Sequence, residues 1–559
     1  MNYTAEYENW LANADEETRK ELLSIKNDEN EIKERFGAKL EFGTAGLRGI
    51  MGAGTRRINI YTIRQVTQGL ANCIIKSGGE QRGVAIAYDS RHNSPLFALE
   101  TALVFAANGV KAYLFESLRP TPELSFAIRH LGAISGVVVT SSHNPKQYNG
   151  YKVYWEDGGQ LPPKVSCKVL EEIDAIGYFE TKTMTEEAAI EAGLLEYIGE
   201  YVDEAYLNAV LEQNRTIGGD LSIIYTPIHG AGNILVRETL KRAGFTNVQV
   251  VKEQELPDGD FPTAPYPNPE VKQPFEMAIE YAKKSNADLI LATDPDADRV
   301  GAAYLDHDGE YYHLNGNQVG ALLTEYVLSR NGDKGGTVIS TIVSTRMTST
   351  ICKAYGVDYY DVYTGFKFIA EKILELELAG NNNFIMGWEE SYGYLAGSYA
   401  RDKDAVVASM LIAELAQTLK NRDLTMRDAL SEMYKKYGYH VEGVLNVVRE
   451  GLAGVEVISG IMADLRENTP TEVGGFKVKA FRDYKAGTVK HADGSITSIN
   501  MESANVVYFE FEEGVEMAVR PSGTEPKLKF YFFVTDAEEA KADEKCKRIR
   551  EAAIDRWEA

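Results

Sequence analysis

The feature that most restricts the fold of this chain is an alternation of apolar, strand-like runs with helix-like segments. In the first third of the chain, the runs GVAIAYD, VKAYLF and ISGVVVT alternate with helices expected to begin at Ser94 and Thr121. Ser94 and Pro95 suit the N-cap and first position of the earlier helix. Such alternation predicts parallel strands covered by helices.

The same alternation returns twice. LSIIYT, NVQVVKE and ADLILATD form a second unit, and TVISTIV, DYYDVY and NFIMGW form a third. After Tyr439 the chain changes to short β-rich runs and a charged helix from Asp536. We therefore predict three similar mixed α/β domains with helices packed on sheets, plus a C-terminal α+β domain. At roughly 100 to 200 residues per domain, the length of 559 residues accommodates this number. The expected domains are residues 1–205, 206–325, 326–440 and 441–559.

Charge and cysteine content limit the partners and the compartment. The net charge of −24 repels nucleic acid and anionic membranes, so we expect neither as a partner, and a phosphate site must be a local group of cations and N–H donors. The four cysteines lack metal-ligand or disulfide spacing, which favours a reducing cytoplasm. The acidic N-terminus, from Met1 to Leu23, is typical of an amphipathic helix and not of a signal peptide.

The loops after the last strand of each unit are where ligands should bind, because open α/β sheets bind ligands at the carboxyl ends of their strands. The first of these loops is Thr140-Ser141-Ser142-His143-Asn144-Pro145, followed by Lys152. A hydroxyl beside an imidazole, with a lysine nearby, could form a nucleophile with acid or base partners. A polar turn closed by Asn-Pro is the plain alternative.

The second loop is Asp294-Pro295-Asp296-Ala297-Asp298-Arg299. Alternating carboxylates can converge on one cation, and ligation by oxygen alone suits Mg²⁺. An EF-hand is excluded because its sixth and twelfth positions would be Arg299 and Leu305. The haloacid-dehalogenase pattern fails because Asp298 stands where Thr or Val is expected. A surface acidic cluster is the alternative, but three adjacent carboxylates repel one another without a cation.

The third loop runs from Gly387 to Gly393 and contains Glu389 and Ser391, which together offer an acceptor and a donor suited to sugar hydroxyls. An ordinary strand-to-loop turn, which is the alternative, would have a similar sequence.

Near the N-terminus, residues 43–49 form a Gly-rich stretch carrying Arg48. This stretch does not match G-x-G-x-x-G, and the chain has no G-x-x-x-x-G-K-S/T motif, so neither a dinucleotide nor an NTP site is indicated.

In the fourth domain, residues 520–527 (RPSGTEPK) combine a guanidinium, two hydroxyls, turn amides and an ammonium group. This combination is suited to a phosphate, because Arg binds phosphate as a bidentate fork and turn amides can point inward at an anion. An ordinary β-turn is the alternative.

Taken together, these loops resemble the α-D-phosphohexomutase family. Its hallmarks are a T-x-S-H-N-P phosphoserine loop, a D-x-D-x-D-R magnesium loop, a G-E-x-S sugar loop and an R-x-S-G-T-E-P phosphate loop. All four have counterparts here in the family's order, from about Phe42 to the C-terminus. YNGYKVYW, from Tyr148 to Trp155, is most similar to the branch of phosphoglucomutases and phosphopentomutases. Trp388 departs from the pattern, since many members have Gly directly before the Glu.

The resemblance implies a role for each matching residue. Ser142 would carry the phosphate and, with Asp294, Asp296 and Asp298, hold Mg²⁺. The transferring group would be surrounded by His143, Lys152, Arg299 and Lys403. The general acid and the general base could each be His143, Lys152 or Lys403. The substrate would contact the following residues: Arg48, Thr364, Gly365, Glu389, Ser391, Arg520, Ser522, Gly523 and Thr524.

The activity implied is that of a phosphoglucomutase, which interconverts glucose 1-phosphate and glucose 6-phosphate with glucose 1,6-bisphosphate as intermediate and activator. Phosphopentomutase and phosphomannomutase are alternatives among mutases. A silent sugar-phosphate-binding protein and a phosphatase are alternatives from other classes, although the serine and the Asp triplet are both present. The expected partners are small sugar phosphates, and the sequence leaves monomer and dimer open.

Overall fold

A computed structural model describes residues 2–43, 46–332, 335–449, 451–522 and 527–558. The chain divides into two compact units. The first contains Met1–Ile339 and Gly365–Met426, and the second contains Ser340–Thr364 and Arg427–Ala559. Within the described residues, no helix is long and apolar enough to cross a membrane.

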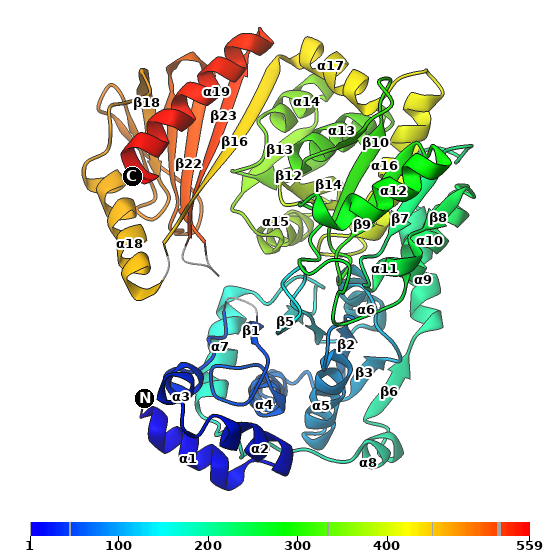
Figure 1. The fold of residues 1–559 in the computed structure, drawn as a ribbon, viewed down its shortest axis with the longest axis vertical. Helices are drawn as coiled ribbons and strands as arrows, with labels where there is room; N and C mark the ends of the chain where they lie inside the picture. The colour runs from blue at the N-terminus through cyan, green and yellow to red at the C-terminus, as the bar shows by residue number, and fades with distance from the viewer. Residues whose placement is uncertain (1, 44–45, 333–334, 450, 523–526, 559) are drawn as a thin grey trace. The chain divides into compact units, whose positions relative to one another are not determined.

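The first sheet of the first unit has six strands in the order β1-β5-β4-β2-β3-β6 (Figure 1). β2, β3 and β4 are parallel, as are β3 and β6, whereas β5 is antiparallel to both β4 and β1. The strands are β1 Gly46–Ile50, β2 Val84–Tyr88, β3 Ala112–Phe115, β4 Ser135–Val139, β5 Tyr148–Trp155 and β6 Leu195–Ile198. The prediction of parallel strands is confirmed for β2, β3, β4 and β6 and was wrong for β5. Only eight residues separate β4 from β5, too few for the crossover that parallel neighbours require.

Some helices of this domain pack directly on the sheet, and others pack on those helices. α5 and α6 pack on β2, while α4 packs against both α5 and α7. The helices are α4 Ile60–Lys76, α5 Ser94–Ala107, α6 Thr121–Leu131, α7 Pro163–Asp174, α8 Glu186–Glu191 and α9 Glu200–Leu211. The expected N-cap of α5 was wrong by one residue: Asn93 is the N-cap, with a left-handed φ of 63°. The hydroxyl of Ser94 instead donates to Asp89 Oδ1 at 2.8 Å.

The N-terminus forms three helices and not the single amphipathic helix expected: α1 Tyr3–Asn13, α2 Glu16–Ser24 and α3 Glu29–Phe36. The break falls at Asp15, whose carboxylate caps α2 by accepting from Thr18 N at 2.8 Å. An aromatic cluster anchors these helices to the rest of the unit, because Trp10 packs edge-on against Phe36 and Tyr61.

The second sheet repeats the first pattern in the order β11-β10-β9-β7-β8, with β7, β8 and β9 parallel and β10 antiparallel. Its strands are β7 Ile223–Thr226, β8 Val248–Val250, β9 Leu289–Thr293, β10 Val300–Leu305 and β11 Tyr311–His313. Its helices are α10 Gly232–Arg242, α11 Lys252–Glu255, the 3₁₀ turn η1 Gln273–Phe275 and α12 Glu276–Ser285, and α13 Gly316–Ser329 follows β11 in the chain.

The third set again pairs parallel strands and ends on an antiparallel one, with β12 parallel to β14 and β14 antiparallel to β15. The first unit contains most of β12 Thr337–Thr341, together with α15 Phe366–Leu378, β14 Phe384–Glu389, β15 Gly393–Ala396 and α16 Ala405–Lys420. α14 Met347–Tyr355 and β13 Asp358–Val362 belong to the second unit.

The second unit also contains an antiparallel sheet in the order β16-β23-β22-β21-β18-β19-β20, with β17 paired to β18. One hydrophobic cluster joins α18 and α19 to these strands, so both helices cover the same face. The elements are α17 Met426–Tyr437, β16 Tyr439–Val448, α18 Gly451–Glu467, β17 Glu472–Val473, β18 Phe476–Asp483, β19 Thr488–His491, β20 Ile496–Ser498, β21 Val507–Phe511, the 3₁₀ turn η2 Glu512–Gly514, β22 Val515–Pro521, β23 Lys527–Asp536, α19 Glu539–Ala553 and the π-helical turn η3 Ile554–Glu558. The last helix begins three residues after the expected Asp536, which ends β23.

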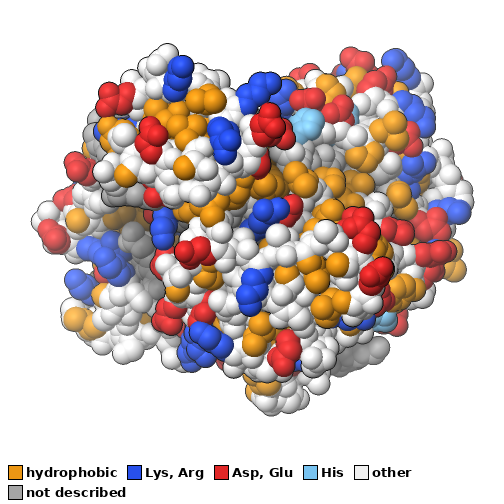
Figure 2. All heavy atoms as spheres, turned by 90° about the horizontal axis from the view of Figure 1, so that it is seen from below, with side chains coloured by type: hydrophobic (Ala, Val, Ile, Leu, Met, Phe, Trp, Pro, Cys, Tyr) orange, Lys and Arg blue, Asp and Glu red, His pale blue; other side chains and the backbone are white. Residues whose placement is uncertain are grey.

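The predicted fold class, three similar mixed α/β domains and an α+β domain, is confirmed. Acidic and basic side chains lie among each other on the face shown in Figure 2. On that face, therefore, the charge of −24 is not gathered into one continuous acidic surface.

Candidate active site

The loop after β4 presents Ser142 in a strained backbone conformation. Ser142 has a φ of 51°, a left-handed value that is uncommon for a residue with a side chain. Its N–H donates to Thr140 Oγ1 at 2.8 Å, and that hydroxyl donates to Asp89 Oδ2 at 2.6 Å. Backbone strain of this kind persists only where the surroundings hold the residue in place. The loop is therefore built to present the Ser142 hydroxyl.

Asp89 and Arg91, which sequence reasoning did not identify, supply much of that support. Both side chains are fully buried, and Arg91 Nε lies 3.2 Å from Asp89 Oδ2. The Arg91 guanidinium donates to the backbone carbonyls of Ser142, Asn144, Pro145 and Tyr148. One buried cation thus fixes the course of the loop from residue 142 to residue 148. The sequence signal that could have identified them is an acidic and a basic residue directly after the apolar strand β2.

The loop after β9 gathers three buried carboxylates. One oxygen from each of Asp294, Asp296 and Asp298 lies within 4.8 Å of the other two. Asp294 Oδ1 accepts from the backbone N–H groups of Asp298 and Arg299, which curls the loop round the first carboxylate. Ala297 takes a left-handed φ of 49° within this curl.

Burial and the neighbouring carboxylates raise the pKa of Asp294 well above its usual range. Burial alone would also raise the pKa of Asp298, but the charges of Lys403, Lys152 and Arg299 outweigh it and hold that pKa well below the usual range. Asp296 Oδ1 is buried and has no hydrogen-bond partner among the described residues. Three convergent carboxylates and an unsatisfied buried oxygen fit a hard divalent cation such as Mg²⁺.

Arg299 connects this carboxylate loop to the serine. Its Nη1 donates to Ser142 Oγ at 2.7 Å, and Ser142 Oγ donates to Asp294 Oδ2 at 2.8 Å. His143 Nδ1 lies 3.2 Å from Ser142 Oγ and 3.1 Å from Arg299 Nη1. Burial and the charges of Arg299 and Arg48 lower the pKa of His143 well below its usual value, so its imidazole is neutral at pH 7. Its Nδ1 can then accept from Arg299.

Two lysines lie against the same carboxylates. Lys152 Nζ, from β5, donates to Asp296 Oδ2 at 2.8 Å, and Lys403 Nζ is 3.1 Å from Asp298 Oδ2. Burial would lower the pKa of each lysine, but the carboxylates outweigh it and raise both pKa values. Both lysines therefore carry a full charge in this arrangement. Asp402, another residue that sequence reasoning did not identify, holds Lys403 Nζ at 3.0 Å.

The loop after β14 lies beside Arg299. Ser391 O accepts from Arg299 Nε at 3.0 Å, and Glu389 is buried at the end of the strand. Gly393 allows Lys403 to approach, because a Cβ at position 393 would lie 2.0 Å from Lys403 Cδ. Trp388, the departure from the family pattern, packs in the core: its Nε1 donates to Thr324 Oγ1 at 3.2 Å.

The structure thus brings one set of predicted residues into a single connected group in the first unit: Ser142, His143, Lys152, Asp294, Asp296, Asp298, Arg299 and Lys403. Arg48, on β1, adjoins the serine loop with its Nη1 3.4 Å from Asn144 Oδ1. Gly365, the N-cap of α15, also belongs to the first unit and has a φ of 118°, which favours glycine.

The other predicted residues belong to the second unit or lie outside the described residues. Thr364 has a buried hydroxyl with no hydrogen-bond partner among the described residues. Arg520 lies on β22 opposite Lys529, and Ser522 N donates to Lys527 O at 2.7 Å. Gly523 and Thr524 lie outside the described residues.

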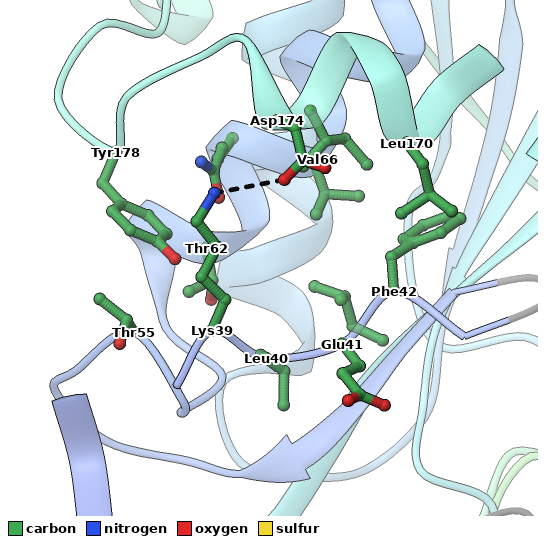
Figure 3. Close-up of a pocket in the computed structure, with 13 residues that line it drawn as sticks. Lys39, Leu40, Glu41, Phe42, Thr55, Thr62, Val66, Leu170, Asp174 and Tyr178 are labelled. Atoms are coloured by element: carbon green, nitrogen blue, oxygen red, sulfur yellow. Dashed lines mark hydrogen bonds and ion pairs between the residues drawn. The ribbon is translucent and has the colours of Figure 1, made fainter. Parts of the chain in front are cut away.

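A cavity of about 300 Å³ elsewhere in the first unit contains none of the predicted site residues. Figure 3 shows Phe42 beside Leu170 in its mixed apolar and polar lining, and an ion pair between Lys39 and Asp174, whose Nζ and Oδ1 atoms are 3.2 Å apart. The cavity is therefore separate from the group around Ser142.

Comparison with known proteins decides the family. Domains I, II and III of the phosphoglucomutase/phosphomannomutase alpha/beta/alpha type match residues 39–180, 200–307 and 315–437, and the corresponding C-terminal domain matches residues 461–551. The chain belongs to the phosphoglucomutase/phosphomannomutase family. The resemblance to α-D-phosphohexomutases is confirmed, and the chain is a phosphosugar mutase of the isomerase class.

Relatives named phosphoglucomutase extend this likeness over nearly the whole chain. The protein of Staphylococcus aureus (strain N315) is 38% identical over 534 residues, which cover 94% of this chain and 95% of the relative. The protein of Staphylococcus epidermidis is 38% identical over 529 residues, with the same coverage of each chain.

Solved structures share the fold. A putative phosphomannomutase from Thermus thermophilus superposes with a TM-score of 0.68 at 22% identity, covering 93% of this chain and 99% of that one. The open form of the Paramecium phosphoprotein parafusin, a phosphoglucomutase, gives a TM-score of 0.66 at 16% identity, covering 92% of this chain and 95% of that one.

Proposed function

We propose that this mutase interconverts α-glucose 1-phosphate and glucose 6-phosphate through a phosphoserine at Ser142 and a glucose 1,6-bisphosphate intermediate. The observation that carries the proposal is the position of Ser142 Oγ, which bonds Arg299 and Asp294 at the edge of a buried group of carboxylates. The 38% identity to proteins named phosphoglucomutase supports glucose as the sugar.

Mg²⁺ would be held by Asp294, Asp296 and Asp298 together with an oxygen of the phosphate on Ser142. When bound, it would neutralise charge on the phosphoryl oxygens during transfer. Asp296 Oδ1, which is buried without a partner among the described residues, is a free ligand atom for such a cation.

In the first half of the cycle, the bond between phosphorus and Ser142 Oγ breaks and a bond forms to O6 of glucose 1-phosphate. The O6 hydroxyl loses its proton and Ser142 Oγ gains one, with His143, Lys152 and Lys403 as the candidate proton carriers. Arg299, which donates to Oγ at 2.7 Å, stabilises the charge that develops on the departing oxygen. The bisphosphate then turns round and returns its 1-phosphate to Ser142.

The other residues would bind substrate. Glu389 and Ser391 would bond the sugar hydroxyls, and Arg48, Thr364 and Gly365 would contact the sugar phosphate. The phosphate that does not react would be bound by Arg520, Ser522, Gly523 and Thr524. We also propose domain boundaries at residues 205, 325 and 440. The proposal further includes a cytoplasmic location and activation by glucose 1,6-bisphosphate.

Intact-protein mass spectrometry after incubation with glucose 1,6-bisphosphate tests the phosphoserine. The wild type should gain one phosphoryl group that maps to Ser142, and Ser142→Ala should gain none and lose nearly all turnover. Phosphate on another residue would overturn the assignment. Comparing kcat/KM for glucose, ribose and mannose 1-phosphates then tests the sugar: a preference for ribose 1-phosphate would make the protein a phosphopentomutase, and a preference for mannose 1-phosphate a phosphomannomutase.

A further inference from the structure

The carboxylate loop from residue 294 to residue 298 is fastened by the starts of three helices. The carbonyl of Pro295 accepts from Ala231 N at 2.8 Å, that of Asp296 from Thr121 N at 2.9 Å, and that of Ala297 from Ala405 N at 3.2 Å. These donors stand at the starts of α10, α6 and α16. Three successive carbonyls therefore receive free N–H groups at helix N-termini, where partial positive charge suits an acidic loop.

Thr121 differs from the other two donors because its side chain also reaches the loop. Its Oγ1 donates to Asp296 Oδ2 at 3.0 Å, across 175 positions of sequence, and the residue is fully buried. A Thr hydroxyl at a helix start commonly bonds backbone of its own helix. Here the hydroxyl instead bonds the carboxylate of Asp296, in the loop after β9. Pro120, the N-cap of α6, makes no side-chain cap bond.

The two oxygens of Asp296 consequently have different environments. Oδ2 accepts from both Thr121 Oγ1 and Lys152 Nζ, whereas Oδ1 is buried with no partner among the described residues. With Oδ2 occupied by these two donors, the carboxylate is held in one rotamer, and its unoccupied oxygen is kept available. Outer-shell partners that orient a carboxylate are a common determinant of metal affinity.

We propose that Thr121 is a positioning residue for the divalent cation: its hydroxyl fixes Asp296 so that Oδ1 is presented as a ligand. This inference rests on the proposed Mg²⁺ site. The segment before Thr121 is itself fixed, because Arg119 bonds both carboxylate oxygens of Asp203 at 2.8 and 2.9 Å. The helix start can therefore serve as a rigid support.

Binding of Mn²⁺ to the full-length, EDTA-treated protein, followed by electron paramagnetic resonance and calorimetry, tests the inference without turnover. Thr121→Val keeps the shape and the backbone N–H but removes the hydroxyl, and we expect its Kd for Mn²⁺ to rise about tenfold. Thr121→Ser keeps a hydroxyl and should bind as the wild type does. In Mg²⁺-dependent assays, Thr121→Val should need more Mg²⁺ for half-maximal activity and recover near wild-type kcat when Mg²⁺ saturates.

The matched control is Thr101→Val on α5, where a buried threonine hydroxyl donates to Phe97 O at 2.8 Å. Thr101→Val removes a comparable buried hydroxyl that lies away from the carboxylates, and it should leave the Kd for Mn²⁺ unchanged. The proposal is overturned if Thr121→Val binds within twofold of the wild type, or if Thr121→Ser or Thr101→Val weakens binding equally. If Thr121→Val does not fold, Thr121→Ala carries the same expectation. Absence of Mn²⁺ binding by the wild type would instead overturn the proposed metal site.

Discussion

Replacing Arg91 by Met tests whether a buried cation holds the serine loop in its reactive shape. Arg91 donates to four carbonyls between residues 142 and 148 and lies 3.2 Å from Asp89 Oδ2. Met has a side chain of similar length and no charge, so it fills much of the volume but cannot donate. Arg91→Met therefore removes the support of the loop and leaves Asp89 as a buried carboxylate without its cation.

The expected loss of stability is about 3 to 5 kcal/mol, the usual result of removing one partner of a buried ion pair. The carbonyls that lose their donor belong to the loop that presents Ser142. A displacement of about 1 Å in a reacting group lowers turnover on the order of a hundredfold, and we expect kcat to fall by that amount. Adding Asp89→Asn should recover part of the stability, because it removes the orphaned charge, but should not recover kcat.

Thermal unfolding, kcat and incorporation of phosphate from glucose 1,6-bisphosphate would be measured for both single variants and the double variant. Arg82→Met is the control, since Arg82 also donates to backbone carbonyls, at Gly132 and Ala133, but is 43% exposed. The reasoning is refuted if Arg91→Met keeps kcat within twofold of Arg82→Met. It is also refuted if the destabilising effects of Arg91→Met and Asp89→Asn simply add, because coupled partners should not be additive.

Three further predictions concern the metal, the second unit and the core. EDTA should abolish activity and Mg²⁺ restore it, with Asp296→Asn losing kcat by more than it loses sugar-phosphate affinity; full activity in metal-free buffer would contradict this. Arg520→Ala should lower kcat/KM at least about tenfold in both directions of the reaction, since it removes a charged fork worth roughly 1.5 to 3 kcal/mol, and unchanged steady-state constants would reduce the loop to a turn. Burial raises the pKa of Glu414 from 4.5 to about 7, so the folded state keeps a proton that the unfolded chain has lost. The contribution of Glu414 to stability should therefore fall as pH rises from 4.5 to 7. At 1.4 kcal/mol per pKa unit, the stability of Glu414→Gln relative to wild type should rise by about 3 kcal/mol over that range. Thermal unfolding of both proteins as a function of pH would measure this difference, and a difference that does not change with pH would contradict the prediction.

Sequence patterns singled out the candidate loops because these loops follow apolar strands. Ser142, Asp294 and Glu389 each stand at or just beyond the carboxyl end of a strand, where ligands of open α/β sheets collect. The residues that were missed act on these loops from elsewhere in the chain. Thr121 reaches Asp296 across 175 positions and Arg91 reaches Ser142 across 51, and neither lies in a motif. Their contacts arise only when the sheets are assembled.

The errors in the fold had local causes that were present in the sequence. Asp15, with Thr18 three positions later, is a helix-start signal in the middle of the predicted N-terminal helix. The short connection before Tyr148 requires an antiparallel neighbour, which a rule based only on alternating strands and helices does not include. The N-cap of α5 was misplaced because Ser94 is a good capping residue in general, whereas here Asp89 takes its hydroxyl.

The charges around Ser142 explain how an acidic chain can handle phosphate. Metal ligation requires all three carboxylates to be ionised. In that state Asp294, Asp296 and Asp298 are met by three cations, Lys152, Lys403 and Arg299, so these six side chains are electrically balanced. Asp402 adds a further carboxylate, which also accepts from Tyr154 and Gln160. A phosphoserine adds roughly 1.5 to 2 negative charges at pH 7, and a divalent cation adds two positive ones. The charge of the phosphoryl group nearly cancels that of the cation, so the buried site can accept both with little change in its net charge. Either group alone would leave about two uncompensated charges away from water. Phosphorylation of Ser142 and cation binding should therefore favour each other, and by linkage the effect must be the same in both directions.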